Sequence, residues 1–245
     1  MLDGGAGTGI VTSHLMRSGR AVVAGASLAV ALAVAVRHLL RTRHPLIDLR
    51  VLRTATLRLQ AAGGSVYRGT ILAVPFLVPL LLQLGFGWTA TTAGLAMMAI
   101  FVGNVGIKPV TTPLMRRFGI RAVLLGSLAA GIACLVGLAF VRADTPLPVL
   151  LGLLLVSGIF RSIGFTAFIT GAFADVPDAE MAHANTLVST TQELASGLGV
   201  AVAALFVRLG ELVAPTADGP YRVAFLLLAA LLLIPAVQSW RLPRT

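Results

Sequence analysis

Long apolar stretches follow one another along the whole chain, and short polar connections separate them. An apolar run of about 18 or more residues is long enough to cross a lipid bilayer as a helix. The pattern predicts seven spans, at residues 20–37, 59–83, 92–112, 120–141, 148–172, 185–209 and 221–240. We therefore expect an all-α polytopic membrane protein with seven transmembrane helices.

Four of these spans contain a charged residue inside an otherwise apolar run: Arg68, Lys108, Arg161 and Glu193. A charge at the centre of a membrane helix costs about 2.5–3.5 kcal/mol on insertion scales. Such residues usually face the interior of a helix bundle or a water-filled path, because that placement lowers the cost. These four side chains are therefore the first candidates for function.

The composition supports a membrane protein and argues against a nucleic-acid-binding one. The chain is 57% hydrophobic and 11% charged, with a net charge of +10. Most of the arginines lie between the apolar spans, where they set topology and meet anionic lipid head groups. We expect the lipid bilayer as a partner and no nucleic acid.

The distribution of arginines predicts how the chain crosses the membrane. The connection at 38–58 and the turn at 113–121 are rich in arginine, so the positive-inside rule places them in the cytoplasm. The connection 173–184 and the C-terminus then share that side, and the N-terminus lies outside. Residues 45–58 have an apolar face and an arginine face, which predicts a short amphipathic helix along the cytoplasmic interface.

These features divide the chain into parts. Residues 1–19 form an N-terminal tail, 20–58 a first membrane helix with the amphipathic segment, 59–240 a six-helix unit and 241–245 a cytoplasmic tail. Within the six-helix unit, the triplets 59–141 and 148–240 begin on opposite sides of the membrane. That is the 3+3 inverted repeat of transporter halves, although any six consecutive spans would satisfy the same parity.

Local sequence motifs point to a specific family. The relevant segments are RGTILAVPFLVPLLLQLGFG at 68–87, TTAG at 91–94, KP at 108–109, PLMRRFGIR at 113–121, ANTLVSTTQELASGLGVAVA at 184–203 and HPLIDLRVLR at 44–53. In their order and spacing they resemble the C-terminal half of the 14-helix drug:proton antiporter branch of the major facilitator superfamily, the EmrB/QacA type. The resemblance covers about residues 20–240.

The resemblance implies a function and a missing part. It implies a multidrug or small-molecule efflux transporter in the cell membrane, working by alternating access, with the proton gradient as its energy source and no cofactor. The substrate is expected to be an amphipathic small molecule. Members of the family need two six-helix halves, so the N-terminal half would come from a longer chain or from a partner. The alternative is a membrane fragment or assembly module without transport of its own.

The resemblance suggests functional roles for the charged residues inside the spans. For each of them a purely structural role is the alternative. Arg68, Arg161 and Lys108 look like a pattern of one subgroup of the branch, whereas a neutral residue would be expected at Glu193. Glu193 could take up and release protons, or it could make one interhelical hydrogen bond in place of glutamine. Arg161 could hold an anionic group, or it could bind carbonyls of neighbouring helices. By depth alone, Arg68, Arg161 and Glu193 could share one polar network.

The turn with Arg116, Arg117, Gly119 and Arg121 resembles the superfamily's cytoplasmic loop motif between paired helices. There the glycine permits a tight turn and the arginines can stabilise one access state, which would make it a gating loop. Ordinary positive-inside charge explains the same arginines equally well.

No pattern in the sequence indicates an enzyme. The chain has no metal-ligand spacing, no glycine-rich phosphate loop and no serine nucleophile with a plausible histidine partner. We therefore expect neither catalytic nor metal-binding residues.

Overall fold

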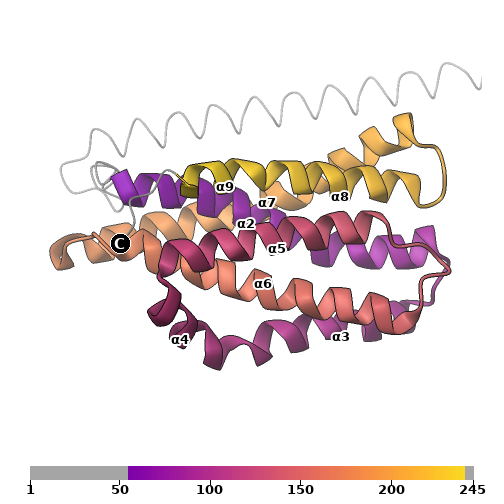
Figure 1. Cartoon of the computed structure of the whole chain (residues 1–245). Helices are drawn as coiled ribbons and strands as arrows, with labels where there is room; N and C mark the ends of the chain where they lie inside the picture. The colour runs from indigo at the N-terminus through magenta and orange to yellow at the C-terminus, as the bar shows by residue number, and fades with distance from the viewer. Residues whose placement is uncertain (1–54, 241–245) are drawn as a thin grey trace, which may run out of the picture. The chain divides into compact units, whose positions relative to one another are not determined.

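The computed structural model of the chain describes residues 55–240, with side chains at Leu57 and from Ala62 onward. The predicted first span at 20–37, most of the amphipathic segment 45–58 and both tails lie outside the described residues. Every regular element in the described part is helical (Figure 1). The elements are α2 Ala55–Leu80, η2 Leu81–Gly85, α3 Ala90–Gly106, α4 Lys108–Phe118, α5 Ile120–Ala139, α6 Leu147–Phe173, η3 Asp178–Glu180, α7 Met181–Val213, α8 Gly219–Leu231 and α9 Leu233–Trp240.

Six membrane spans account for the described helices, and they match the last six predicted from the sequence. Five stretches are long and apolar enough to cross a membrane on their own: Ala62–Gly85, Ile120–Ala139, Leu147–Phe173, Asp178–Val213 and Gly219–Trp240. The pair α3 and α4 forms the sixth span if the two helices are taken together, with a bend of 50° between them. The fold is thus an all-helical membrane fold.

The bend between α3 and α4 corrects the predicted third span. The sequence suggested one continuous helix at 92–112, but α3 ends at Gly106 and α4 begins at Lys108. Pro109 explains the break, because a proline has no N–H to donate and its ring clashes with the carbonyl four residues earlier. Lys108 therefore stands at the start of a second helix rather than within one straight span.

Pro75 and Pro79 lie inside α2, and the helix continues through both. Beyond Leu80 its hydrogen bonding widens to the π pattern, in which the Phe86 amide donates to the Leu81 carbonyl at 3.0 Å. Because a proline has no N–H, the carbonyl four residues before each proline lacks its usual helical donor. One of these carbonyls becomes important in the candidate site.

The two triplets of spans pack through equivalent glycine crossings. The first helix of one triplet, α2, crosses the second helix of the other, α7, where Gly69 lies against Gly199. The counterpart crossing joins α6 and α3, where Gly158 lies against Ile100 and Gly103 lies against Leu155. At Gly199 and Gly103 an added Cβ would overlap backbone atoms of the partner helix, so only glycine allows this approach.

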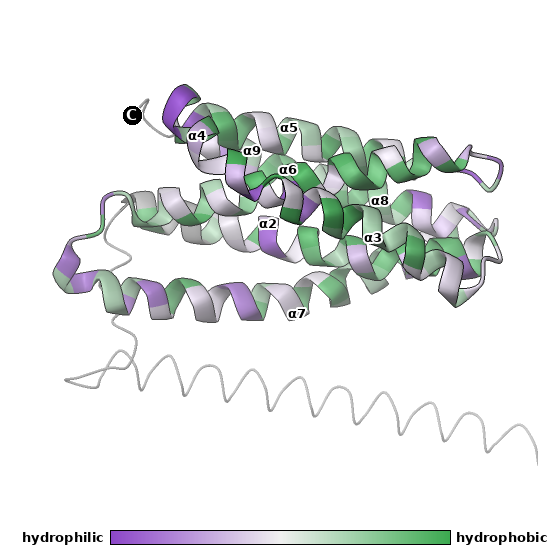
Figure 2. Ribbon diagram, turned by 90° about the horizontal axis from the view of Figure 1, so that it is seen from below, coloured by the Kyte–Doolittle hydropathy of each residue, from purple (hydrophilic) through white to green (hydrophobic). Residues whose placement is uncertain are grey.

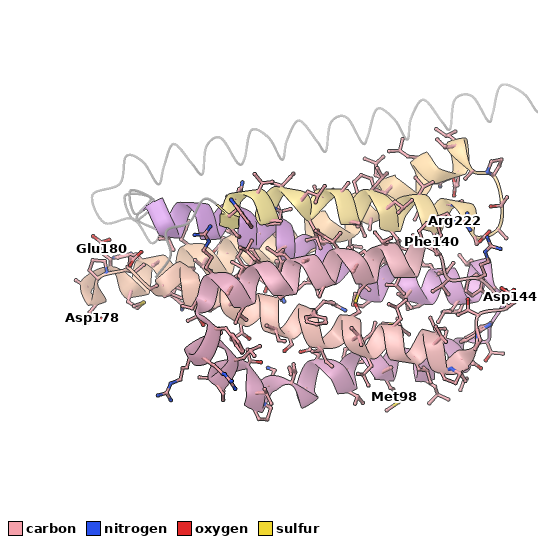
Figure 3. All side chains as sticks on the ribbon, viewed as in Figure 1. Met98, Phe140, Asp144, Asp178, Glu180 and Arg222 are labelled. Atoms are coloured by element: carbon pink, nitrogen blue, oxygen red, sulfur yellow. The ribbon has the colours of Figure 1, made fainter. Side chains whose placement is uncertain are left out.

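Successive spans were expected to run in opposite directions, and the contacts at the helix ends agree with this. At one end, Leu57 packs with Val176 and Val188, which places the start of α2 beside the connection before α7. Arg121, at the start of α5, donates to the carbonyl of Trp240 at the end of α9. Figure 3 shows Asp178 and Glu180 at one end of the helices, and Asp144 and Arg222 at the other.

Candidate substrate and proton pathway

Arg161 is the most deeply buried charged residue of the described chain. It lies in the middle of α6, and only 9% of it is exposed. Its Nη2 donates a hydrogen bond to the carbonyl of Ile71 in α2. That carbonyl would normally accept from the amide of residue 75, but Pro75 has no N–H. The proline therefore creates the acceptor that Arg161 uses.

Two further donors of Arg161 remain available. Its Nε and Nη1 are buried and have no hydrogen-bond partner among the described residues. Buried guanidinium groups without partners are costly, so most proteins satisfy them. Both donors are enclosed by protein atoms, so a substrate or a partner carboxylate reaches them only if the surrounding helices move.

Tyr67 also lies in this site, although the sequence alone indicated no function for it. Its ring is buried against Phe168, with the two ring centroids 5.0 Å apart. Its hydroxyl donates toward the carbonyls of Phe160 and Arg161, both at 3.2 Å. Tyr67 thereby links α2 to α6 beside the guanidinium. The available signal was a hydroxyl-bearing aromatic residue next to Arg68 inside an apolar span.

Arg68 lies one residue further along α2, but it points to a different neighbour. Its Nε donates to the Ser196 hydroxyl of α7 at 3.2 Å, and its guanidinium carbon lies 4.8 Å from the centre of the Phe165 ring. The Ser196 hydroxyl in turn donates to the Gln192 carbonyl at 2.7 Å. Arg68 is therefore held between α6 and α7 by a hydrogen bond and a cation–π contact.

Glu193 lies on the face of α7 that the other described helices leave uncovered. Its side chain is exposed, and it makes no ion pair with Arg68 or Arg161. Of the five single-helix spans in the described chain, the one containing α7 has the smallest buried share. Figure 2 shows hydrophilic positions along the N-terminal part of α7. The exposed polar residues there are Asn185, Thr186, Ser189, Thr190 and Glu193.

The structure thus separates the three residues that depth alone grouped together. Arg68 and Arg161 hold α2, α6 and α7 to one another, whereas Glu193 faces outward. Lys108 is also exposed, at the beginning of α4, and forms no ion pair with a described residue.

The predicted gating loop is a one-residue connection between α4 and α5. Gly119 has φ 79° and ψ 151°, a conformation that side-chain-bearing residues rarely adopt. Arg116 and Arg117 are exposed in the last turn of α4. Arg121 donates to the Trp240 carbonyl at 2.5 Å and lies 5.9 Å from the centre of the Trp240 ring. The gating role itself stays a prediction.

In the described part of the chain, no group of three or more His, Cys, Asp or Glu side chains is arranged to hold a metal ion. The chemistry that the site offers is hydrogen bonding and charge inside a membrane bundle.

Paired helix triplets and charges inside the spans are features found in membrane transporters. The family model for the Major Facilitator Superfamily matches residues 61–245. The chain belongs to the major facilitator superfamily, which confirms the resemblance of its motifs.

Several curated bacterial relatives carry the name multidrug resistance protein MdtD. The protein of Cronobacter sakazakii is 32% identical over 250 residues, which cover 99% of this chain and 51% of that protein. The Pectobacterium atrosepticum protein is 34% identical over 171 residues, covering 69% of this chain and 36% of that protein. One from Escherichia coli O6:H1 is 30% identical, with coverages of 99% and 51%. The chain thus spans about half the length of the curated relatives it matches.

Proposed function

We propose that this chain supplies the C-terminal half of a proton-coupled efflux transporter, which exports amphipathic small molecules by alternating access. The observation that carries the proposal is the uncovered polar face of α7, in a chain half as long as its similar relatives. Facing lipid, that row of polar groups and a carboxylate would be costly. Facing a second six-helix half, the same groups would line a polar path between the two.

In this proposal the charged residues have distinct tasks. Glu193 takes up and releases the coupling proton, because it is the exposed carboxylate within the polar N-terminal part of α7, whereas the exposed Glu211 near the end of α7 is paired with Arg208. Arg161 uses its remaining donors to hold an anionic or polar group, either of the substrate or of the other half. Arg68 holds α7 in register through Ser196. Gly119 and its neighbouring arginines form the turn that stabilises one access state.

The names of the relatives support efflux of drugs as the activity, since those proteins are named for multidrug resistance. We place the complete transporter in the cell membrane, with the C-terminus of this chain in the cytoplasm because of its arginine-rich connections. The second half would come from a longer chain or from a partner.

Reconstitution tests this proposal. Proteoliposomes with an imposed pH gradient would contain the full chain alone, the N-terminal half of the Cronobacter sakazakii relative alone, or both together. We expect uptake of a fluorescent cationic dye only with both halves, and its loss when an ionophore collapses the gradient. Transport by this chain alone would show that no second half is needed. No transport by a correctly inserted pair, with the full-length relative active in parallel, would contradict the proposed function.

A further inference from the structure

A groove with a volume of about 330 Å³ lies between α4, α5 and α6, next to the turn at Gly119. Leu114 and Phe118 of α4 form one wall, Ala122 and Gly126 of α5 form another, and Phe160 and Ile163 of α6 complete it. Ser127 also lines the groove, but its hydroxyl donates to the Leu124 carbonyl at 2.8 Å. The groove therefore offers an apolar surface to its occupant.

Cations stand at the end of α4 that borders this groove. The guanidinium carbon of Arg117 lies 5.4 Å from the centre of the Phe118 ring, and Phe118 is itself part of the wall. Arg116 belongs to the same exposed last turn, but it lies about 160° around the helix from Phe118 and so on the far side from the groove. The ion pairs found in the described chain, Arg208–Glu211 and Arg222–Asp218, do not involve these arginines. Their charge is thus not balanced by any described carboxylate.

An apolar groove with an arginine at one end matches the two parts of an anionic phospholipid. The acyl chain fits the apolar walls, and guanidinium groups bind phosphate oxygens through paired N–H donors. The one-residue connection at Gly119 keeps the arginine-bearing end of α4 beside the start of α5, so that the cation and the apolar walls meet in one place. We propose that this groove binds an anionic phospholipid, with its phosphate on Arg117 and one acyl chain along Phe118 and Gly126.

This inference does not depend on the proposed transport function or on which end of the helices faces the cytoplasm. The site needs only lipid head groups at the arginine-bearing end of α4. A vesicle with the same lipids in both leaflets supplies them whichever way the protein is inserted. Binding and transport can therefore be tested separately.

A tryptophan placed in the groove wall can report the lipid that touches it. The full chain would carry Phe118→Trp in a background with Trp88→Phe and Trp240→Phe, reconstituted in vesicles of phosphatidylcholine and phosphatidylglycerol. Lipids brominated on the acyl chain quench tryptophan fluorescence on contact. We expect brominated phosphatidylglycerol to associate several-fold more strongly than brominated phosphatidylcholine, at about fivefold per arginine in contact.

Matched variants then show which residues cause the preference for phosphatidylglycerol. Arg117→Gln should abolish it. Arg116→Gln, on the far side of α4, and Arg142→Gln, an exposed arginine at the opposite helix end, should leave it nearly unchanged. Gly126→Leu fills the groove and should reduce quenching by both lipids. Gly152→Leu is its control, because both glycines have open space where a Cβ would lie. Circular dichroism and gel filtration check that each variant remains folded.

Three results would overturn the proposal. Equal quenching by the two lipids would show a groove without head-group selectivity. A phosphatidylglycerol preference that survives Arg117→Gln would place the anionic site elsewhere. A tryptophan that neither brominated lipid quenches would show that protein, such as a second copy of the chain, covers the groove.

Discussion

Arg161 donates a hydrogen bond to the helix carbonyl that Pro75 leaves without its usual partner. The two residues lie far apart in the sequence and on different helices. The proline removes a donor from α2, and the arginine supplies one from α6. Each residue thereby lowers the cost of placing the other inside a membrane bundle.

This relationship predicts an energetic coupling between positions 75 and 161. Arg161→Ala should lower the free energy of unfolding by about 1–3 kcal/mol, because the Ile71 carbonyl then has no donor. In a Pro75→Ala background the restored helical N–H can serve that carbonyl, so the same substitution should cost less. A double-mutant cycle of unfolding in detergent micelles measures the difference. Additive effects would mean that the two residues act independently.

The glycine crossing of α2 and α7 predicts a strong difference between two neighbouring glycines. Gly199→Ala should destabilise the protein by about 1–3 kcal/mol, since its Cβ would overlap the backbone at Gly69. Gly197→Ala should be neutral or slightly stabilising, because no described atom lies within 4 Å of its added Cβ. Thermal unfolding of both variants gives the comparison. Equal effects would argue against close packing at this crossing.

The connection between α4 and α5 predicts strain on substitution of its single residue. Gly119→Ala must adopt φ 79° or shift the two helices, and we expect a loss of about 1–3 kcal/mol. Gly126→Ala, in open space within α5, is the control and should change stability little. Denaturant unfolding of the two variants measures this effect. A Gly119→Ala protein as stable as its control would show that the turn can be rebuilt cheaply.

Glu193 predicts how pH should affect transport by the completed transporter. If it carries the coupling proton, Glu193→Gln should flatten the dependence of export on pH without unfolding the protein. The same substitution should leave folding intact, because the side chain is exposed in the described structure. Export rates at several external pH values, with circular dichroism as a folding check, provide the measurement. An unchanged pH profile would exclude Glu193 as the coupling residue.

Arg161 and Lys108 should differ in their importance for transport. Arg161→Ala removes buried donors between α2 and α6, whereas Lys108→Ala removes an exposed charge at the start of α4. We therefore expect a larger loss of export for Arg161→Ala at equal protein level. Arg161→Lys separates the effect of charge from that of donor geometry, since an ammonium group keeps the positive charge but lacks the planar set of donors. The reverse order would place the substrate path nearer to α4.

Apolar patterning predicted all six described spans, counting α3 and α4 as one, because hydropathy depends only on neighbouring residues. The same pattern did not predict the break at Ile107. The sequence contains Pro109, but a proline is compatible with either a bent or a broken helix. The candidate site was predictable only in part. Arg161 could be recognised as costly, but its acceptor on Ile71 and its neighbour Tyr67 belong to another helix.

The sequence by itself determined the membrane class, the order of the described spans, the family and the residues that carry charge inside the spans. Tertiary structure decided which of those charges are buried and which are uncovered. Arg161 is enclosed by α2 and α6, while Glu193 faces away from every other described helix. The physical reason is that the cost of a membrane charge depends on the groups that surround it, and these come from distant parts of the chain.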